Sequence, residues 1–547
     1  MESRKKSNAS DISIYPGLKE TSTEDEISTG NTEDSLLSSR TSTETISSKK
    51  KDGTQCCLNK KKGKCGQNSC LIFGVLLIGW GVLTLFYKPY DMFMDQRIQM
   101  TPGLPPYEWW FDPPEEVILK IYLFNVTNSE EFLNGTDSKL KLDEVGPVIY
   151  REKLTHSNPI FNENGTFTYT ANRTAIYLPE LNTIDLNSTI VMPNLGVLLI
   201  PGFLYDASVF TKIGVNLMMS SLNSHPFIKT TIHNYLWNIT DPLLDFAQTL
   251  APNLVPTKNV GILNKIYSEM EDNVTVYIGT KFGHRKFFLI DKYDGTDNLP
   301  HFNGDKCGDK VTNSSEGVSY PQFLTRNDTL KYWRKTLCKV GNLYYSRDVK
   351  LYGVDAFRYD LTPSTFDRTN PSYDDCYKGT PALPNGLSDA APCYFGVPLA
   401  ASFPHFLHGD DVIRTYVEGM KPDMEKHSSF VIVEPNTGIP LHGIARSQSN
   451  LVMNNMRGFN DKIKKFSDIT IPLTWFEYNQ VGIPWYIEWL IYFVVVLVPI
   501  LQYLFIACLF FVGICLVIIY FRARSRSKSH LVENKTLAFE TEVFLKP

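Results

Sequence analysis

The chain has 547 residues and a net charge of −4, with 43% hydrophobic and 20% charged residues. These averages exclude a collagen-like chain, a fully disordered chain and a polytopic membrane protein. Ten cysteines are too few for a disulfide-dense mini-scaffold, and a pI near 6.2 excludes a nucleic-acid binder that acts through bulk positive charge. The averages conceal large differences between the two ends of the chain and its middle.

The first 67 residues are predicted to form a disordered cytoplasmic tail. Residues 1–55 are rich in Ser, Thr and Glu and poor in aromatic residues, so they bury too little apolar surface to fold. Seven lysines and three cysteines gather between residues 49 and 65. Cysteines beside a membrane are candidates for S-palmitoylation, although free thiols in a reducing cytosol are an equal alternative. The candidates are Cys56, Cys57 and Cys65.

Two apolar runs predict membrane-spanning helices. Residues 71–87 read LIFGVLLIGWGVLTLFY without a charge, which with its neighbours predicts a first transmembrane helix over 68–88. Residues 490–521 are uncharged over 32 positions, so 489–521 is predicted to hold an aromatic interfacial segment followed by a second transmembrane helix. The first run begins too far into the chain for a cleaved signal peptide.

Basic residues beside both runs predict the orientation of the chain. Lysines precede the first run, and Arg522, Arg524, Arg526 and Lys528 follow the second. Because positive residues stay on the cytoplasmic side, both ends, including a C-terminal tail over 522–547, are expected in the cytosol. Residues 89–488 are therefore predicted to form one extracellular or lumenal domain.

Glycosylation sequons and cysteines support that topology. Nine Asn-x-Ser/Thr sequons lie between the two runs, a density typical of a glycan-coated surface in the secretory pathway. They are Asn125, Asn134, Asn164, Asn172, Asn187, Asn238, Asn273, Asn313 and Asn327. The same segment contains four cysteines, Cys307, Cys338, Cys376 and Cys393, which predicts two disulfides with three possible pairings. Their spacing lacks the close ligand pairs of zinc sites.

The central domain is predicted to be mostly β, with a helical insert. Short β-branched and aromatic runs separated by Gly, Pro, Asn and Asp predict strands, and Pro435–Gly438 predicts a hairpin turn. The predicted strands cover 117–126, 147–150, 166–170, 274–278, 287–290, 356–359, 430–433 and 469–473. Residues 209–250 instead carry apolar residues at helical spacing. Pro226 and Pro242 suit first-turn helix positions, and Asp241 is a candidate N-cap.

No catalytic signature is present. The chain has no G-x-S-x-G, H-E-x-x-H, P-loop or G-x-G-x-x-G motif, so no enzymatic activity and no cofactor is predicted. The group His405, His408, Asp410 and Asp411 is a weak candidate for a metal site. Its proline and aromatic neighbours favour a structured turn instead.

Several segments in chain order resemble the class B scavenger receptors. This family includes the fatty-acid translocase, the high-density-lipoprotein receptor, the lysosomal integral membrane protein type 2 and the insect sensory neuron membrane proteins. The matching segments are EEVILKIYLFNVTNSEEF (115–132), DEVGPVIYRE (143–152), YLWNITDPLL (235–244), FPHF (403–406) and FVIVEPNTGIPLHG (430–443). The resemblance extends from about residue 70 to 520.

The resemblance implies a barrel-like β ectodomain with a lipid tunnel, capped by a helical bundle at 209–250. It also implies the disulfides Cys307–Cys376 and Cys338–Cys393. The cap lacks the lysines that lipid-binding members can carry, since its middle reads SSLNS over 220–224. The nearest basic candidates for ligand binding are His225, Lys229 and His233.

A scavenger receptor is the leading functional hypothesis. It would bind lipids such as fatty acids and sterols, lipoprotein particles or apoptotic debris at the cap and pass lipid to the membrane, with no nucleic-acid partner. The expected location is the plasma membrane, with the lysosomal or endosomal membrane as the alternative. The alternative hypotheses are a trafficking receptor for a protein cargo at the cap and a subunit of an ion channel. The residues between the tails carry a net charge of −9, which favours an apolar or locally basic entrance over bulk capture of polyanions.

Overall fold

The computed structural model describes residues 65–544, except 115, 254, 269–271, 300–308, 368–373, 378, 380 and 395. Contacts divide the chain into two units, Met1–Gly66 and Gln67–Pro547. Cys56 and Cys57 lie outside the described residues, and Cys65 is the first residue of helix α1. Palmitoylation of these cysteines therefore stays a prediction.

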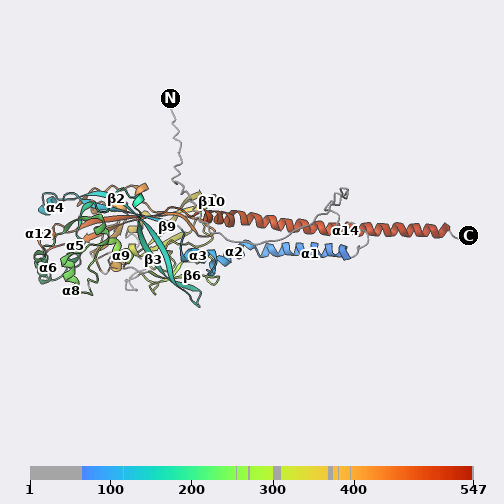
Figure 1. Ribbon diagram of the computed structural model, residues 1–547, viewed down its shortest axis with the longest axis horizontal. Coiled ribbons are helices and arrows are strands. Elements are labelled where there is room, and N and C mark those ends of the chain that lie inside the picture. Colours follow the sequence, from blue (N-terminus) through green and yellow to red (C-terminus); the bar gives the residue numbers. More distant parts are fainter. Residues whose placement is uncertain are drawn as a thin grey trace, which may run out of the picture. The chain divides into compact units, whose positions relative to one another are not determined.

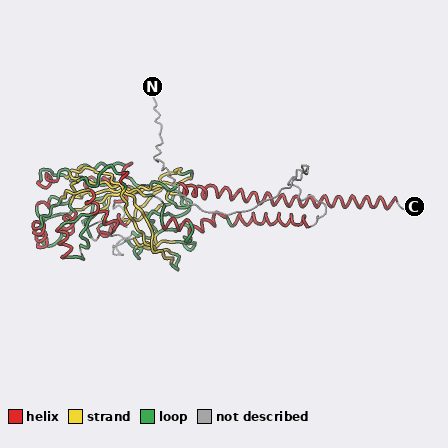
Figure 2. The backbone as a smooth tube through the Cα atoms, in the orientation of Figure 1, coloured by secondary structure: helices red, strands yellow, loops and turns green. Residues whose placement is uncertain are grey.

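Both predicted transmembrane runs are helical (Figure 2). Helix α1 covers Cys65–Phe86; α13 covers Trp485–Tyr492 and leads through a π-helical turn, Phe493–Leu497, into α14, Val498–Phe544. Asn68–Phe86 and Trp485–Leu537 are long and apolar enough to cross a membrane. Helix α14 also continues into the predicted C-terminal tail, where no Gly or Pro interrupts residues 522–544.

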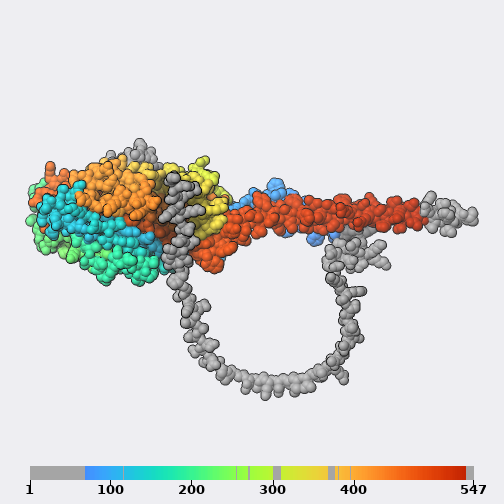
Figure 3. Space-filling view, turned by 90° about the horizontal axis from the view of Figure 1, so that it is seen from above, coloured from blue at the N-terminus to red at the C-terminus, as the bar shows by residue number. Residues whose placement is uncertain are grey.

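Small residues let α1 and α14 approach closely; in the view of Figure 3, α14 (red) covers most of α1 (blue). A Cβ atom on Gly74 would lie 2.9 Å from the backbone oxygen of Gly513, and one on Gly513 would lie 2.7 Å from Ile78 Cγ1. Such small-residue contacts are typical of helix pairs in membranes. Gln502 of α14 is buried, and its Oε1 accepts a hydrogen bond from the backbone N–H of Tyr90 at 3.1 Å. Gln502, a polar side chain within the second apolar run, thus forms a hydrogen bond to the beginning of the ectodomain.

Residues 117–480 build one large, mainly antiparallel sheet. Its strands follow the order β7-β6-β3-β2-β1-β16-β15-β14-β10-β9-β8, with β11, β12 and β13 attached beside this path. The main strands are β1 (Val117–Val126), β2 (Leu140–Phe161), β3 (Thr166–Tyr177), β6 (Asp272–Tyr277), β7 (Ile290–Tyr293), β8 (Thr329–Arg334), β9 (Lys339–Leu351), β10 (Val354–Leu361), β14 (Phe430–Val433), β15 (Pro440–Met453) and β16 (Ile469–Gln480). The attached strands are β11 (Ser388–Asp389), β12 (Leu399–Ser402) and β13 (Val417–Glu418).

A short segment joins the two edge strands and makes the sheet barrel-like. The backbone of Asn313 and Ser314 exchanges hydrogen bonds with Ile290 of β7, at 2.8 Å each. On the other edge, Ser315 N donates a hydrogen bond to the backbone oxygen of Lys331 in β8, and Trp333 N donates one to the backbone oxygen of Ser315, at 2.8 Å each. Because both edges are paired in this way, the sheet has an interior that can hold a ligand.

Most strand predictions are confirmed. The predicted ranges 117–126 and 430–433 coincide with β1 and β14, and the hairpin turn at Pro435–Gly438 joins β14 to β15. The prediction at 287–290 is wrong, because β7 begins only at Ile290, and Phe287 and Phe288 lie in a turn. Phe287 and Phe288 are nevertheless buried, which explains the apolar signal.

The helical segment differs from the predicted 209–250. Its helices are α5 (Leu195–Phe203), α6 (Val209–Ser221), α7 (Ile232–Trp237), α8 (Pro242–Leu250) and α9 (Ile262–Ser268). They extend past the predicted range on both sides, and strand β5 (Phe227–Thr231), which pairs with β4 (Thr189–Pro193), lies between them. Pro226 therefore precedes a strand and does not start a helix. Pro242 does start α8, where the Asp241 side chain accepts a hydrogen bond from Leu243 N at 2.9 Å.

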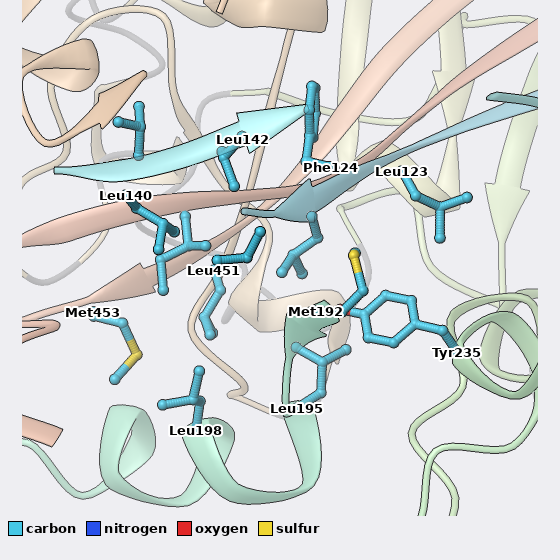
Figure 4. Packing of buried hydrophobic residues seen from close by; sticks show 14 of the residues in the cluster. Leu123, Phe124, Leu140, Leu142, Met192, Leu195, Leu198, Tyr235, Leu451 and Met453 are labelled. Carbon is cyan, nitrogen blue, oxygen red and sulfur yellow. The ribbon is translucent and has the colours of Figure 1, made fainter. Parts of the chain in front are cut away.

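The helices share one hydrophobic core with the sheet. Figure 4 shows Leu195 and Leu198 of α5 and Tyr235 of α7 in the same cluster as Leu123 of β1 and Leu451 of β15. All five side chains are buried. The helices α5–α9, hereafter the cap, are thus packed onto the barrel and are not a separate domain. The remaining short helices are α2 (Pro89–Ile98), α3 (Pro105–Phe111), α4 (Ser129–Asn134), α10 (Asp374–Tyr377), α11 (Met424–His427) and α12 (Asp461–Lys464).

Cys338 and Cys393 form a disulfide in the structure, as one of the expected pairs requires. Both residues are buried. Cys376 is also disulfide-bonded, and Cys307 lies outside the described residues. The pair Cys307–Cys376 accordingly stays a prediction.

Candidate functional site

The first of two large cavities lies between the cap and the barrel, and we call it the cap cavity. It has a volume of about 630 Å³. Its walls are mainly apolar side chains from α5, α6, α8 and β16, including Leu199, Phe203, Met218, Leu244 and Phe476. Such a cavity favours a hydrocarbon ligand over a polar one.

Exposed apolar side chains surround the cap cavity on α6 and α8. Leu217, Phe246 and Leu250 line the cavity and are also exposed to solvent. Beside them on α6, Phe210 is 87% exposed and Ile213 is 47% exposed. Figure 1 shows α6 and α8 at the end of the sheet away from α1. This group of side chains gives the cap an apolar rim, in agreement with the absence of lysines from its middle segment.

The second cavity, the barrel cavity, lies within the strands and has a volume of about 650 Å³. Its lining includes Trp109 of α3 and Tyr486 of α13. Since α13 leads directly into α14, this end of the cavity lies next to the predicted membrane span. The barrel cavity is more polar than the cap cavity, because charged side chains from β2, β3, β8 and β9 contribute to its wall.

The two cavities adjoin one another. Thr336, Leu337, Ser447 and Tyr478, hereafter the junction residues, line both. Along β16 the lining passes from the cap cavity at Leu473 to the barrel cavity at Gln480. Seven residue steps of an extended strand cover about 23 Å. Strand β16, which leads into α13, therefore borders both cavities.

A buried ion cluster lies beside the junction. Glu152 accepts hydrogen bonds from Arg334 at 2.9 Å and from the Tyr267 hydroxyl at 2.6 Å, and Arg334 lies over the Tyr478 ring, 4.6 Å from its centroid. Burial disfavours the carboxylate of Glu152, yet Arg334 and Arg173 hold its pKa below the ordinary value. The cluster stays ionised and fixes Tyr478 at the border of the two cavities.

Lys339 at the start of β9 is the one cation of the barrel cavity whose charge has no carboxylate partner within the described residues. Its side chain is 8% exposed, and its Nζ lies 3.3 Å from the centroid of the Tyr377 ring. Burial lowers the pKa of Lys339 to about 7, although Asp309 and Asp367 act in the opposite direction. The sequence did not point to this residue, because a lysine after a cysteine carries no signal of burial.

Comparison with known proteins assigns the chain to a family. A sequence model of the CD36 family matches residues 70–523. The chain belongs to the CD36 family. Scavenger receptor class B member 1 of Bos taurus is 27% identical over 410 residues, which are 74% of this chain and 78% of the relative. Lysosome membrane protein 2 of Rattus norvegicus is 28% identical over 384 residues, 69% of this chain and 78% of the relative. The resemblance to class B scavenger receptors is confirmed, and so is a membrane location.

The basic candidates on the cap do not line either cavity of this CD36 family member. His225, Lys229 and His233 are exposed, on the loop before β5, on β5 and on α7 respectively. Neither the cap cavity nor the barrel cavity includes them in its lining. Their role in ligand binding stays a prediction, and it could only concern a ligand on the outer surface.

Seven of the nine predicted glycosylation sites expose their side chains. The other two, Asn125 and Asn172, are half-buried. Asn125 accepts a hydrogen bond from Val191 N at 2.8 Å, and Asn172 Nδ2 donates one to Ser157 Oγ at 2.8 Å. The exposed sites are Asn134, Asn164, Asn187, Asn238, Asn273, Asn313 and Asn327. Glycosylation itself stays a prediction.

The weak metal candidate has another structural role. His405 Nε2 lies 2.6 Å from Glu144 Oε2, and its Nδ1 accepts a hydrogen bond from Lys421 N at 3.0 Å. This arrangement places the ring proton on Nε2, where it is donated to Glu144. In the part of the chain that the structure describes, no three His, Cys, Asp or Glu side chains gather as metal ligands.

Proposed function

We propose that this CD36 family member takes up lipid at the cap and passes it through the cap cavity and the barrel cavity to the membrane. The observation that carries this proposal is the set of junction residues, which line both cavities. An apolar chain moving inside the protein avoids contact with water, which is worth about 0.8 kcal/mol for each buried CH₂ group. The apolar rim around Phe210 and Leu217 supports lipid capture by hydrophobic contact.

The topology is part of the same proposal. With both tails in the cytosol, the cap faces the extracellular or lumenal space, and the end of the barrel cavity at Tyr486 faces the outer leaflet. Lipid could then leave beside α3 and α13, where Trp109 and Tyr486 pack together with ring centroids 6.3 Å apart. Aromatic residues prefer this interfacial depth.

A block at the junction tests the proposal. Ser447 is a junction residue on β15, so Ser447→Trp would fill the connection between the cavities with a large side chain. We expect cells that express this variant to lose most uptake of labelled fatty acid and sterol ester, while surface binding of lipoprotein is retained. The matched control, Ser447→Ala, should take up lipid like the wild type. Normal uptake by a folded, surface-exposed Ser447→Trp variant would overturn the route through the cavities.

A lysosomal or endosomal receptor for a protein cargo is the second candidate. Its support is the similarity to lysosome membrane protein 2 and the position of the exposed His225, Lys229 and His233 outside both cavities. Imaging of a tagged full-length chain distinguishes the two: residence at the plasma membrane favours lipid uptake, and residence in lysosomes favours the cargo receptor.

A further inference from the structure

Tyr478 of β16 is the largest side chain among the junction residues. The other three are Thr336, Leu337 and Ser447. Because Tyr478 lines the barrel cavity and the cap cavity at once, its ring lies where a ligand would cross from one to the other. The ring is flat and stiff, and it turns about only two side-chain bonds. Its orientation therefore decides how much of the connection stays open.

A buried ion pair holds the ring of Tyr478. The guanidinium carbon of Arg334 lies 4.6 Å from the centroid of this ring, which is a cation–π contact. Arg334 is itself fixed, because its Nη2 atom donates hydrogen bonds to both carboxylate oxygens of Glu152, at 3.2 and 2.9 Å. The side chains of Arg334 and Glu152 are only 13% and 6% exposed. Tyr478 thus has a preferred position that a passing ligand would have to disturb.

The strand beside Tyr478 leaves room for a ligand or for the ring to move. Strand β15 pairs with β16, and Ala445 lies directly opposite Tyr478. Alternate residues of a strand share a face, and on this face of β15 they are all small: Gly443, Ala445, Ser447 and Ser449. Gly443 and Ala445 line the barrel cavity, Ser449 lines the cap cavity, and Ser447 lines both. A row of small side chains therefore passes the junction next to one bulky ring.

This arrangement treats narrow and wide lipids differently. A linear acyl chain is flexible and can bend past a flat ring that stays in place. The fused rings of a sterol are wide and stiff, and a closely packed protein wall does not yield to them freely. A wide lipid must therefore turn the Tyr478 ring away from Arg334 and lose the cation–π contact.

We propose that Tyr478 is a selectivity gate between the two cavities, which lets linear acyl chains pass with its ring in place and slows sterol esters, since they must displace the ring. This inference rests on the proposed function, because it concerns passage through the junction. It adds a residue that sets the relative rates of two classes of lipid. Arg334 is a positioning residue, because it acts on the ligand only through the ring of Tyr478.

The test compares the rates of a narrow and a wide lipid. Initial uptake of tritiated palmitate and of tritiated cholesteryl oleate, delivered in the same phospholipid emulsion, is measured in cells with equal surface amounts of the full-length chain. In Tyr478→Ala, the ratio of the ester rate to the palmitate rate should rise about threefold or more, because loss of the ring lowers the barrier for the wide lipid alone.

A variant on the opposite wall should act in the other direction. Ala445→Leu fills the space that faces the ring, so it should lower the ratio of the ester rate to the palmitate rate by a similar factor. Tyr478→Phe keeps the ring and should leave this ratio within about twofold of the wild type, since the width of the opening is unchanged. An unchanged ratio in either Tyr478→Ala or Ala445→Leu, on folded protein at the cell surface, would overturn the gate.

The positioning role of Arg334 needs a variant that leaves no buried charge alone. The double variant Arg334→Met/Glu152→Gln removes both charges of the ion pair and keeps side chains of similar length. It should raise the ratio in the same direction as Tyr478→Ala, whereas a purely structural role would lower both uptake rates equally.

A matched control and the earlier junction block separate the gate from the route. Tyr344 is 47% exposed and lines neither cavity, so Tyr344→Ala should change neither rate. If Ser447→Trp abolishes uptake while Tyr478→Ala leaves the ratio unchanged, the gate is wrong and the proposed route remains. Normal uptake by Ser447→Trp would instead overturn the route, and the gate with it.

Discussion

Burial changes the titration of a single residue in the barrel wall. Desolvation lowers the pKa of Lys339 to about 7, so both its ammonium and its amine form are populated at neutral pH. Asp309 and Asp367 favour the ammonium form, but desolvation outweighs them.

A prediction at this scale concerns Asn172. Its Nδ2 atom, to which a glycan would be attached, donates a hydrogen bond to Ser157 from a half-buried position. A glycan would replace one of the two Nδ2 hydrogens and would have to fit beside Ser157 on the paired strands β2 and β3. We expect Asn172 to be unmodified and the exposed Asn187 to be modified, as peptide mapping after enzymatic deglycosylation in heavy-oxygen water can determine. Full glycosylation of Asn172 would contradict this prediction and show that its half-buried position does not prevent modification.

The contact of α1 and α14 leads to a prediction for a whole element. Gly513→Leu would place its side chain against Ile78 and Gly74 and push the helices apart. We expect the full-length chain in detergent to lose about 1–3 kcal/mol of stability, the usual effect of overpacking, seen as a lower temperature of thermal unfolding. Gly79→Leu is a matched control on α1, because a Cβ atom at Gly79 has no neighbour within 4 Å. Equal decreases of the unfolding temperature in both variants would exclude a specific contact between α1 and α14 at Gly513.

The elements also show where sequence reasoning succeeds and where it stops. Strands β1 and β14 and the N-cap Asp241 were predictable because their signals are local: alternation of β-branched residues and a side chain that caps its own helix. Strand β5 was not, since Ile228 and Ile232 have helical spacing and only the pairing with β4 makes 227–231 a strand. Pairing between distant segments overrides a local preference.

The candidate site was even less accessible to sequence reasoning. The family resemblance implied a tunnel without naming its residues, and the wall of the barrel cavity comes from segments as distant as Trp109, Leu337 and Tyr478. Burial of Lys339 results from the same long-range packing. The basic residues that the sequence suggested, His225, Lys229 and His233, lie outside both cavities. The composition of the sequence could indicate an apolar entrance. The position of Lys339 in the described wall of the barrel cavity became visible only in the folded structure.

At the scale of the whole molecule, the disulfide Cys338–Cys393 restrains the barrel wall beside Lys339. It closes a loop with a sequence separation of 55 residues. In the chain-entropy model, removal of a disulfide that closes a loop of this length lowers the free energy of unfolding by about 4 kcal/mol. We expect Cys338→Ala/Cys393→Ala to lower the thermal unfolding temperature in detergent and to reduce the amount of folded protein in the secretory pathway. Conversion of Cys508, within the second predicted transmembrane helix, to Ala is the control, since Cys508 is an exposed free thiol. Unchanged stability without the disulfide would contradict this restraint.

The shared core of cap and barrel has a consequence for how the receptor can open. Because Leu195, Leu198 and Tyr235 are buried in the same cluster as Leu123 and Leu451, lifting the cap would expose the centre of the domain to water. A hinged lid is therefore costly, and on the proposed route a lipid would enter through side-chain rotations at Phe210, Leu217 and their neighbours. Such rotations take nanoseconds or less. On that route the rate of passage should depend on the length of the acyl chain, with little sensitivity to large-scale motion of the protein.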